Sequence, residues 1–417
     1  MLNLNKHINW NIMKTQLIFL SLVFLFASCN NEMEPIPDAN PLQLRVGLQK
    51  RVAQDNEFAF DLLRKTITDV PDTNVFMSPL SVSIALGMTL NGANGDTRSE
   101  IESTLKMSGL SVEDINDYYK VMQTDLPAID PKTKLSLANS IWYKEGYEVK
   151  KTFLDINRNY FNAEVRELDF NQKWALDTIN NWCARKTNNL IKEVLDYIPS
   201  NAVMYLINAV YFKGIWKTQF DKKYTIESNF TNEDSKIVKV NMMHLKDTFA
   251  YGEDDNAQYL DLPYGNNAFS MTVLLPKNGK STKDVLDSMT GEKWTTIISD
   301  MTQQEVEVYL PRFTNKNKFL LNKPLQNMGM VKAFGQGADF TNIANDDLMI
   351  SRVLHDTYID VNEEGTEAAA VTVVEFVKTS FPMNPVVRVN KPFVFVIREK
   401  SSGVILFIGK MGNLVKY

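Results

Sequence analysis

The sequence predicts a single large domain of the α+β class, and three observations support that prediction. Helical periodicity dominates the first half of the chain, and strands mixed with helices dominate the second half. Hydrophobic residues make up 44% and charged residues 23% of the 417 residues, which are the proportions of a globular protein. No internal repeat is present, so one domain is favoured although the length allows two or three.

Helical spacing of apolar residues appears first around Ala59 to Thr66, where Leu62 and Leu63 share a face with them. Residues 74–79 end a short strand, and Pro79 then occupies a position that proline favours at the start of a helix. Further helices are expected at residues 81–90, 97–107, 113–124, 149–161 and 175–187.

Strands follow from residue 202 onward. The run VMYLINAVYF at 203–212 is apolar nearly throughout, which is typical of a strand buried on both faces. Residues 271–276 and 306–313 read as further strands closed by proline. Residues 392–410 read as a hairpin with its turn at 399–403.

Few residues are available for catalysis or metal binding. The cysteines are Cys29 and Cys183, and Cys183 lies in a helical pattern that makes it a lone core thiol. The histidines are His7, His244 and His355, and none has a second histidine at metal-ligand spacing. Nucleophile-elbow, P-loop and dinucleotide motifs are absent. We therefore expect no catalytic residue, no metal and no cofactor, and the net charge of -5 argues against a nucleic-acid partner.

The N-terminus has the pattern of a targeting signal. Residues 17–27 form an apolar run behind Lys14, too short to span about 30 Å of hydrocarbon as a helix. The run closes on FASC at 26–29, which resembles a bacterial lipoprotein box whose Cys29 thiol takes a diacylglycerol. The alternatives are an ordinary secretory peptide or a short hydrophobic anchor.

We expect a signal peptide over 1–28, with Met13 as an alternative start, and a tether over 29–44. The protein would then lie in a bacterial cell envelope, at the outer membrane or cell surface, or be secreted. It would touch the membrane only through its N-terminal lipid.

The segment 363–381, EEGTEAAAVTVVEFVKTSF, alternates in the manner of a strand. Its even positions are uncharged and small or apolar: Thr366, Ala368, Ala370, Thr372, Val374 and Phe376. Its odd positions carry the charges: Glu367, Ala369, Val371, Val373 and Glu375. One face could therefore enter a core. Gly365 and the alanines equally suit an exposed loop, and residues 363–370 also have helix propensity, so the residues alone leave these alternatives open.

A segment that suits both a loop and a strand could switch between them. A strand of about 12 residues would form about a dozen ladder hydrogen bonds, each worth ~1 kcal/mol net, and would add apolar burial. The total is on the order of ten kcal/mol, comparable to the stability of a whole domain. Only a kinetic restraint would keep such a segment out of a sheet.

The stretch HDTYIDVNEEGTEAAAVT at 355–372 closely resembles the inhibitory hinge of the serpin family, including its bacterial lipoprotein members. Five further blocks resemble the family in the same order, at 74–86, 207–220, 310–313, 337–343 and 390–410. The resemblance spans residues 45–417. It implies a serpin fold with three β-sheets, the central one mixed, about eight to nine helices and an exposed reactive loop at about 363–387.

The resemblance also implies a function and its residues. The protein would be a monomeric suicide-substrate inhibitor that forms a covalent 1:1 complex with serine proteases, and cysteine proteases are a further target class. The cleaved loop would insert into the central sheet and trap the acyl-enzyme. The implied hinge comprises Glu363, Glu364, Gly365, Thr366, Glu367, Ala368, Ala369, Ala370 and Thr372.

The position of the attacked bond follows from the family's usual loop length. Counting fourteen residues from Gly365 places the bond at Thr379–Ser380, and a loop one residue shorter places it at Lys378–Thr379. Val377 is a further cleavage position. Trypsin-like enzymes should choose Lys378, and elastase- or subtilisin-like enzymes Val377 or Thr379, which predicts broad specificity.

The resemblance assigns structural rather than catalytic roles to five more residues. Ser78, Ser81, Asn208 and His355 match a polar cluster beneath the sheet, called the shutter, and Trp216 matches a tryptophan where insertion begins. A second hypothesis is a non-inhibitory serpin that acts as a chaperone or binding protein. A third, an enzyme, would need a nucleophile–base pair that the chain lacks.

Overall fold

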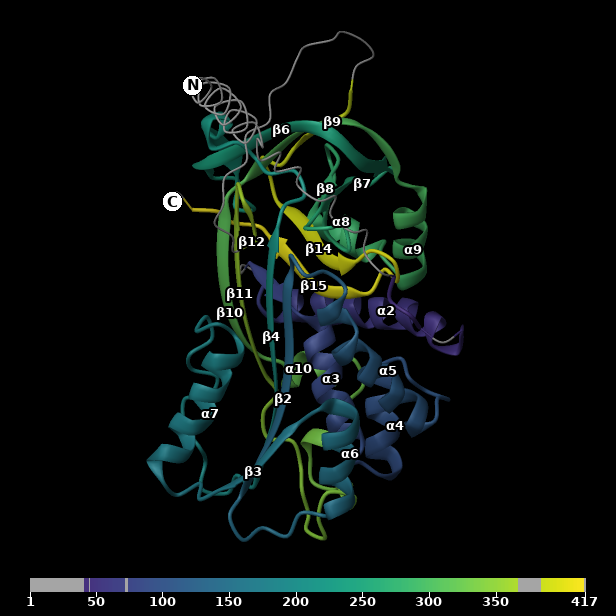
Figure 1. Ribbon diagram of the computed structural model, residues 1–417, viewed down its shortest axis with the longest axis vertical. Coiled ribbons are helices and arrows are strands. Elements are labelled where there is room, and N and C mark those ends of the chain that lie inside the picture. The colour runs from purple at the N-terminus through teal and green to yellow at the C-terminus, as the bar shows by residue number, and fades with distance from the viewer. Residues whose placement is uncertain (1–40, 45, 72–73, 367–383, 416–417) are drawn as a thin grey trace, which may run out of the picture. The chain divides into compact units, whose positions relative to one another are not determined.

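Two β-sheets and nine α-helices make up the part of the chain that the structure describes (Figure 1). The structure is a computed structural model, and it describes residues 41–44, 46–71, 74–366 and 384–415. These residues belong to one unit that spans residues 38–417. The expected signal peptide, Cys29 and most of the tether lie outside the described residues.

Five helices lie where the apolar spacing predicts them, with ends that differ by a few residues. The helix expected around Ala59 to Thr66 begins earlier, at Val46, and the three helices after residue 281 were not predicted. Helix α3 has Pro79 at its first position, and the Ser78 side chain caps it by accepting a hydrogen bond from Ser81 N at 3.2 Å. The nine helices are α2 (Val46–Asp69), α3 (Pro79–Leu90), α4 (Gly95–Thr104), α5 (Val112–Thr124), α6 (Lys151–Phe161), α7 (Lys173–Lys186), α8 (Thr282–Asp287), α9 (Gly291–Asp300) and α10 (Asn322–Asn327). None of the described helices is long and apolar enough to cross a membrane.

The larger sheet has nine strands in the order β1-β15-β14-β8-β7-β6-β9-β13, with β5 paired to β6. Its strands are β1 (Val75–Met77), β5 (Ile226–Thr231), β6 (Ile237–Glu253), β7 (Ala257–Pro263), β8 (Phe269–Pro276), β9 (Thr302–Pro311), β13 (Val386–Arg388), β14 (Phe393–Glu399) and β15 (Ile405–Met411). Three sheets were expected, but strand β6 pairs with β5 and β9 along much of its length and with β7 at its end. It thereby joins two expected sheets into one.

The smaller sheet has six strands in the order β10-β11-β12-β4-β2-β3 and is mixed, because only β2 and β3 run parallel. Its strands are β2 (Lys134–Lys144), β3 (Glu164–Leu168), β4 (Met204–Ile215), β10 (Phe313–Leu320), β11 (Leu354–Asn362) and β12 (Gly365–Thr366). The predicted strand at 306–313 is divided, since β9 ends at Pro311 and β10 begins at Phe313 in the other sheet.

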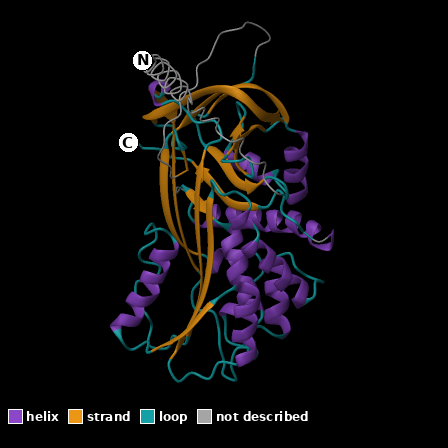
Figure 2. Cartoon of the chain, viewed as in Figure 1, coloured by secondary structure: helices purple, strands orange, loops and turns teal. Residues whose placement is uncertain are grey.

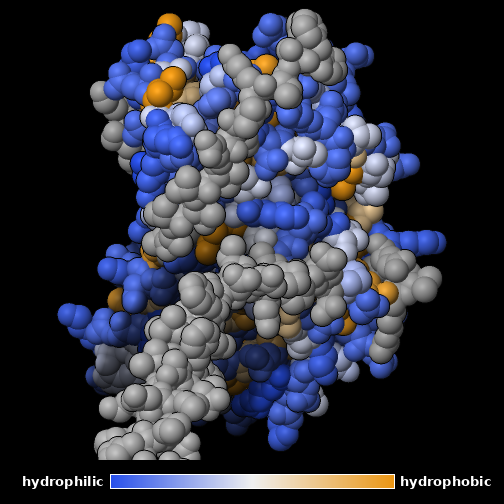
Figure 3. All heavy atoms as spheres, turned by 45° about the horizontal axis from the view of Figure 1, so that its top comes forward, coloured by the Kyte–Doolittle hydropathy of each residue, from blue (hydrophilic) through white to orange (hydrophobic). Residues whose placement is uncertain are grey.

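Both faces of the six-stranded sheet are packed, as the apolar run at 203–212 predicts. On the outer face, Ile207 and Ala209 of β4 pack with Trp142 of β2 against Ile179 and Trp182 of α7. On the inner face, the alternate residues of β4 join the main core. Figure 2 shows the long strands of this sheet between α7 on one side and the α3 to α6 group on the other. The surface around the top of the molecule is mostly hydrophilic, with isolated apolar side chains (Figure 3).

Candidate functional site at the open centre of the six-stranded sheet

Among the residues that the structure describes, none fills the centre of the six-stranded sheet below the two residues of β12. Gly365 and Thr366 pair with Ile215 and Gly214 of β4 on one side, and with Asn362 and Val361 of β11 on the other. Beyond these pairs, no ladder joins β4 to β11 among the described residues. The two long strands therefore flank a gap that begins where β12 ends.

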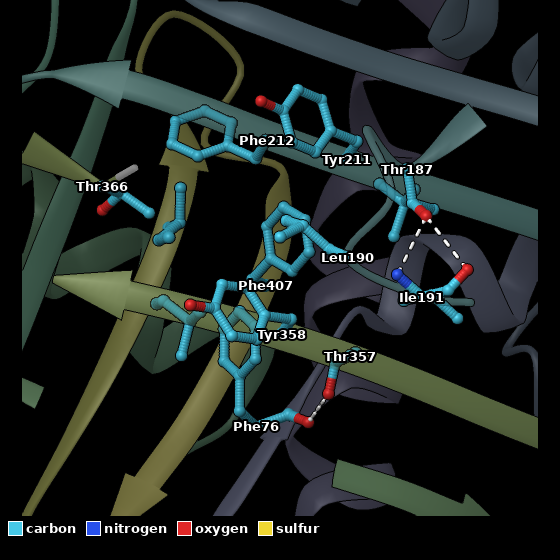
Figure 4. A pocket seen from close by; sticks show the side chains of 13 residues that line it. Phe76, Thr187, Leu190, Ile191, Tyr211, Phe212, Thr357, Tyr358, Thr366 and Phe407 are labelled. Atoms are coloured by element: carbon cyan, nitrogen blue, oxygen red, sulfur yellow. Dashed lines mark hydrogen bonds between the residues drawn. The ribbon is translucent and has the colours of Figure 1, made fainter. Parts of the chain in front are cut away.

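A narrow hollow occupies this gap (Figure 4). The empty volume of the hollow is about 400 Å³, which includes open solvent. Only about 20 Å³ of it is wide enough to admit the centre of a water molecule. Residues of both strands line it, together with Thr366 at its end and the segment after α7: Val210, Tyr211, Phe212, Thr357, Tyr358, Ile359, Thr187, Leu190 and Ile191. The hollow is thus too narrow for a bulky ligand.

Gly365 is required at its position for two physical reasons. Its φ angle is +152°, a backbone conformation that side-chain-bearing residues rarely adopt. A Cβ atom there would lie 2.1 Å from the carbonyl oxygen of Gly214 and 2.8 Å from the Cα of Ile215, and both are backbone atoms that cannot turn aside. The predicted hinge glycine therefore allows β12 to lie against β4.

Thr366 faces inward, as the alternation of the segment predicts. It is buried, and its hydroxyl lies 2.7 Å from the hydroxyl of Tyr264. Trp216 stacks on the same tyrosine ring at 4.4 Å and donates from its indole nitrogen to Asn362 O at 2.9 Å. The structure thus brings Trp216 to the hinge. Tyr264 was not predicted, because it belongs to no motif of the sequence.

The two acidic hinge residues that the structure describes are buried rather than solvated. Glu363 is 2% exposed, accepts a hydrogen bond from Thr225 at 2.7 Å, and lies 3.6 Å from Arg312 Nε. Glu364 is 8% exposed and pairs with Lys222 at 2.7 Å. Their main-chain carbonyls accept hydrogen bonds from Phe220 N and Trp216 N, each at 2.9 Å.

A buried charge needs its partners, so these contacts hold the turn before Gly365 in place. The partners come from the segment after β4 and from the β9–β10 junction. Their roles could not be predicted, because more than 50 residues separate each of them from the hinge.

The four predicted shutter residues come together between α3, β4 and β11. Ser78 N donates to His355 Nε2 at 2.9 Å, and the Ser78 hydroxyl donates to Leu406 O at 2.7 Å. The Ser81 hydroxyl donates to Asn208 Oδ1. The cluster thus tethers both strands that flank the gap to α3 by polar contacts.

Asn139 of β2 extends this cluster and was not predicted. Its side-chain oxygen accepts a hydrogen bond from Asn208 Nδ2 at 2.6 Å, and its nitrogen donates to Phe161 O at 2.6 Å. An isolated asparagine in a strand pattern gives no signal of such a role.

His355 is neutral in this cluster. Burial lowers the pKa of His355 to about 4. Its Nε2 must be unprotonated to accept the hydrogen bond from Ser78 N, which agrees with the neutral form. His355 therefore holds β11 to the start of α3.

The remaining predicted site residues lie outside the described residues. These are Glu367, Ala368, Ala369, Ala370 and Thr372 of the hinge and Val377, Lys378, Thr379 and Ser380 around the attacked bond. The expected loop end at 387 needs a correction, because Val386 and Val387 already belong to β13. They pair in parallel with Glu307 and Val308 of β9.

Comparisons with known proteins agree with this architecture. The profile of a family described as "Serpin (serine protease inhibitor)" matches residues 53–414. Human neuroserpin is 34% identical over 355 residues, covering 82% of this chain and 86% of its own length.

Two solved structures have similar folds. The thermophilic serpin tengpin in its native state is 34% identical with a TM-score of 0.81, and the match covers 91% of this chain and 98% of tengpin. Human thyroxine-binding globulin, solved in complex with its ligand, is 28% identical with a TM-score of 0.79, and the match covers 88% of this chain and 99% of that protein.

Proposed function

Because this chain belongs to the serpin family, we propose that it is a suicide-substrate inhibitor of serine proteases. The observation that carries the proposal is the gap between β4 and β11, which already holds Gly365 and Thr366 at its upper end. After cleavage, the following residues would extend β12 down this gap and carry the covalently attached protease with them.

The observed register predicts where each inserted residue would lie. Thr366 is opposite Gly214 on β4 and Val361 on β11. Continued in antiparallel fashion, both registers bring the same residue, Thr372, opposite Asn208 and His355. The first half of the inserted strand would therefore reach as far as the shutter. There the Thr372 hydroxyl would face the polar groups of Asn208 and His355.

The small side chains of the segment fit the same register. Ala368 would point inward between Phe212 and Ile359, two large side chains that line the hollow. Glu367 would point outward between Lys213 and Asp360, neither of which is buried. A large side chain is thus tolerated at the odd-numbered positions of the inserted strand and not at the even-numbered ones.

The test uses this difference between neighbouring positions. The wild-type protein is incubated with trypsin, and we expect a complex that survives SDS. Ala368→Trp should convert the inhibitor into a substrate that trypsin only clips, because the bulky inward side chain blocks insertion without adding a site for trypsin. The matched control Glu367→Trp should still form the complex. Simple clipping of the wild type would instead favour a non-inhibitory serpin, such as a chaperone or binding protein.

We propose broad specificity that depends on which bond of 376–380 is attacked. Lys378→Ala should abolish inhibition of trypsin-like enzymes and leave inhibition of elastase- or subtilisin-like enzymes intact. Mass mapping of the released C-terminal fragment shows the bond used in each complex. A bond outside 376–380 would contradict the proposed register of the loop.

We also propose that Cys29 is acylated and anchors the monomeric protein to a bacterial envelope. Support comes from the sequence alone, in the apolar run that ends at Cys29. Cys29→Ala should move the protein from the membrane fraction to the soluble fraction. An unchanged distribution, with no lipid mass on the N-terminal peptide, would exclude the anchor.

A further inference from the structure

The outer face of the gap between β4 and β11 carries two polar side chains at the end far from β12. Tyr205 is the second residue of β4 and packs against the apolar cluster that α7 covers. Arg352 lies two residues before Leu354, which packs against the same cluster. The chain is still extended there, because Leu321 N donates to Val353 O at 2.8 Å next to the last pair of the β10–β11 ladder. Residues two apart in an extended chain share a face, so both side chains lie on the outer face of the gap.

The Arg352 guanidinium is held in place, but its charge is weakly compensated. Its central carbon lies 4.7 Å from the centre of the Tyr197 ring, and it donates to Tyr197 O at 3.3 Å. The carboxylate of Asp196 lies 3.6 Å away and is 53% exposed, whereas the Arg352 side chain is 20% exposed. An ion pair with an exposed partner contributes little to stability. A guanidinium has five N–H donors, so Arg352 can take a second carboxylate.

Tyr205 supplies a second donor to the same place. Its hydroxyl is buried and has no hydrogen-bond partner among the residues that the structure describes. Burial raises the pKa of Tyr205, and the positive charge of Arg352 opposes this with a smaller effect. The charge at the start of β11 thus reaches the hydroxyl on β4, which agrees with two side chains that face each other across the gap. A buried hydroxyl without a partner costs stability, and a phenol is a suitable donor to a carboxylate.

The pairing of β12 brings one acidic residue of the loop between these two groups. The register observed at Gly365 and Thr366, continued in antiparallel fashion, places Glu375 opposite Tyr205 on one side and Arg352 on the other. This position is three residues, or about 10 Å, beyond the one that meets the shutter. A carboxylate that enters a partly buried site loses its hydration, and the loss is costly unless a cation and hydrogen-bond donors replace the water. Arg352 and Tyr205 are such groups.

We propose that Arg352 and Tyr205 form a receiving site for the Glu375 carboxylate, and that this contact fixes the inserted strand beyond the shutter. The inference rests on the proposed function, because the site is filled only after the cleaved loop inserts. Arg352 is a positioning residue, since it acts on the inserted strand and not on the attacked bond. Without it, Glu375 would lose its hydration and gain no charge partner, so the second half of the insertion would slow. The attached protease would then have more time to complete the cleavage and leave.

The test compares the guanidinium unfolding midpoints of the intact protein and of the protein nicked within 376–380. Glu375→Gln should leave the intact midpoint within about 0.1 M of wild type and lower the nicked midpoint by about 0.5 M. Arg352→Glu should lower the nicked midpoint by about 1 M, because two carboxylates then meet in the inserted form. Adding Glu375→Gln to Arg352→Glu should recover about half of that loss, since the neutral amide removes the repulsion. A merely structural role of Arg352 would give no such recovery.

Glu367→Gln is the matched control. The same register places residue 367 between Lys213 and Asp360, whose opposite charges offset each other, so its nicked midpoint should change by less than about 0.2 M. The stoichiometry of inhibition of trypsin should rise at least about twofold for Arg352→Glu, because slower insertion favours release of the protease, and stay unchanged for Glu367→Gln.

Two outcomes would overturn the proposal, and they can be told apart. If nicking stabilises the wild type but Arg352→Glu shifts both forms equally, with no recovery by Glu375→Gln, the receiving site is wrong and the proposed function stands. If nicking leaves the midpoint of the wild type unchanged, the loop does not insert, and the proposed function and the receiving site fail together.

Discussion

The two sheets of this molecule are held together in different ways. The nine-stranded sheet has a middle in which β8, β14 and β15 are buried along their whole length and are joined by backbone ladders. The six-stranded sheet has an open centre, and polar side chains such as Asn208 and His355 hold its two flanking strands. Apolar side chains that are buried in this way would be exposed to water if the strands separated. The hydrogen bonds of polar side chains can instead be replaced by hydrogen bonds to an incoming strand. The difference allows one sheet to change while the other stays constant.

Cleavage of the loop should have the largest effect on stability, and only in the six-stranded sheet. Filling the gap would add on the order of ten kcal/mol, because each inserted residue gains ladder hydrogen bonds and buries apolar surface. We expect a large rise in the melting temperature after nicking by a protease that cuts within 376–380. Calorimetry of the intact and the nicked protein measures it, and an unchanged melting temperature would contradict the insertion mechanism.

A cavity in the nine-stranded sheet should affect both forms alike. Leu274 of β8 is fully buried between β7 and β14. Leu274→Ala should lower the free energy of unfolding by about 2–5 kcal/mol, through lost burial and the cavity left behind. Denaturant unfolding of the intact and nicked proteins should give equal losses. A loss confined to one form would show that the two sheets are coupled.

Acid should weaken the six-stranded sheet through His355. Burial lowers its pKa to about 4 in the folded protein, against about 6.5 when unfolded, so the unfolded chain binds the extra proton between these values. Stability is therefore full above about pH 6.5 and is lost as the pH falls toward 4, by on the order of 3 kcal/mol. His355→Gln keeps a hydrogen-bond acceptor that cannot be protonated. Its stability should depend less on pH between 7 and 4 than that of the wild type, and identical pH profiles would exclude this role.

The smallest expected effect is a loss of stability at the shutter that differs between the intact and the nicked protein. Ser81→Ala removes the donor to Asn208 Oδ1 and should cost the intact protein about 1–3 kcal/mol, the range for a buried group left unpaired. The loss should be smaller after nicking, because the register would bring the Thr372 hydroxyl to Asn208. The double variant Ser81→Ala/Thr372→Val should restore the full loss in the nicked form. Equal losses for the single variant in both forms would contradict the predicted register.

Much of the fold could be predicted, because local patterns encode it. Helical spacing located α3 to α7 to within a few residues, and Pro79 marked the start of α3. It found only the second half of α2 and missed α8 to α10. The inward direction of Thr366 followed from simple alternation along the segment. The division at Pro311 was missed, because a proline that ends one strand gives no indication that the next begins two residues later in another sheet.

The candidate site was predictable only in part. Resemblance identified Ser78, Ser81, Asn208 and His355, and the structure brings them together. Asn139 and Tyr264 complete the shutter and the hinge, yet nothing in their own neighbourhoods distinguishes them. Contacts between residues far apart in the sequence depend on strand order, which no local pattern specifies.

The sequence by itself determined that residues 363–381 can be either a loop or a strand, since small uncharged residues alternate with charged ones and no proline intervenes. Only the tertiary structure decided where such a strand would go. The gap exists because β4 and β11, more than a hundred residues apart in the chain, stand side by side without a ladder in the described part of the sheet. Side-chain alternation is a property of neighbouring residues, whereas an unfilled place between two strands is a property of the whole fold.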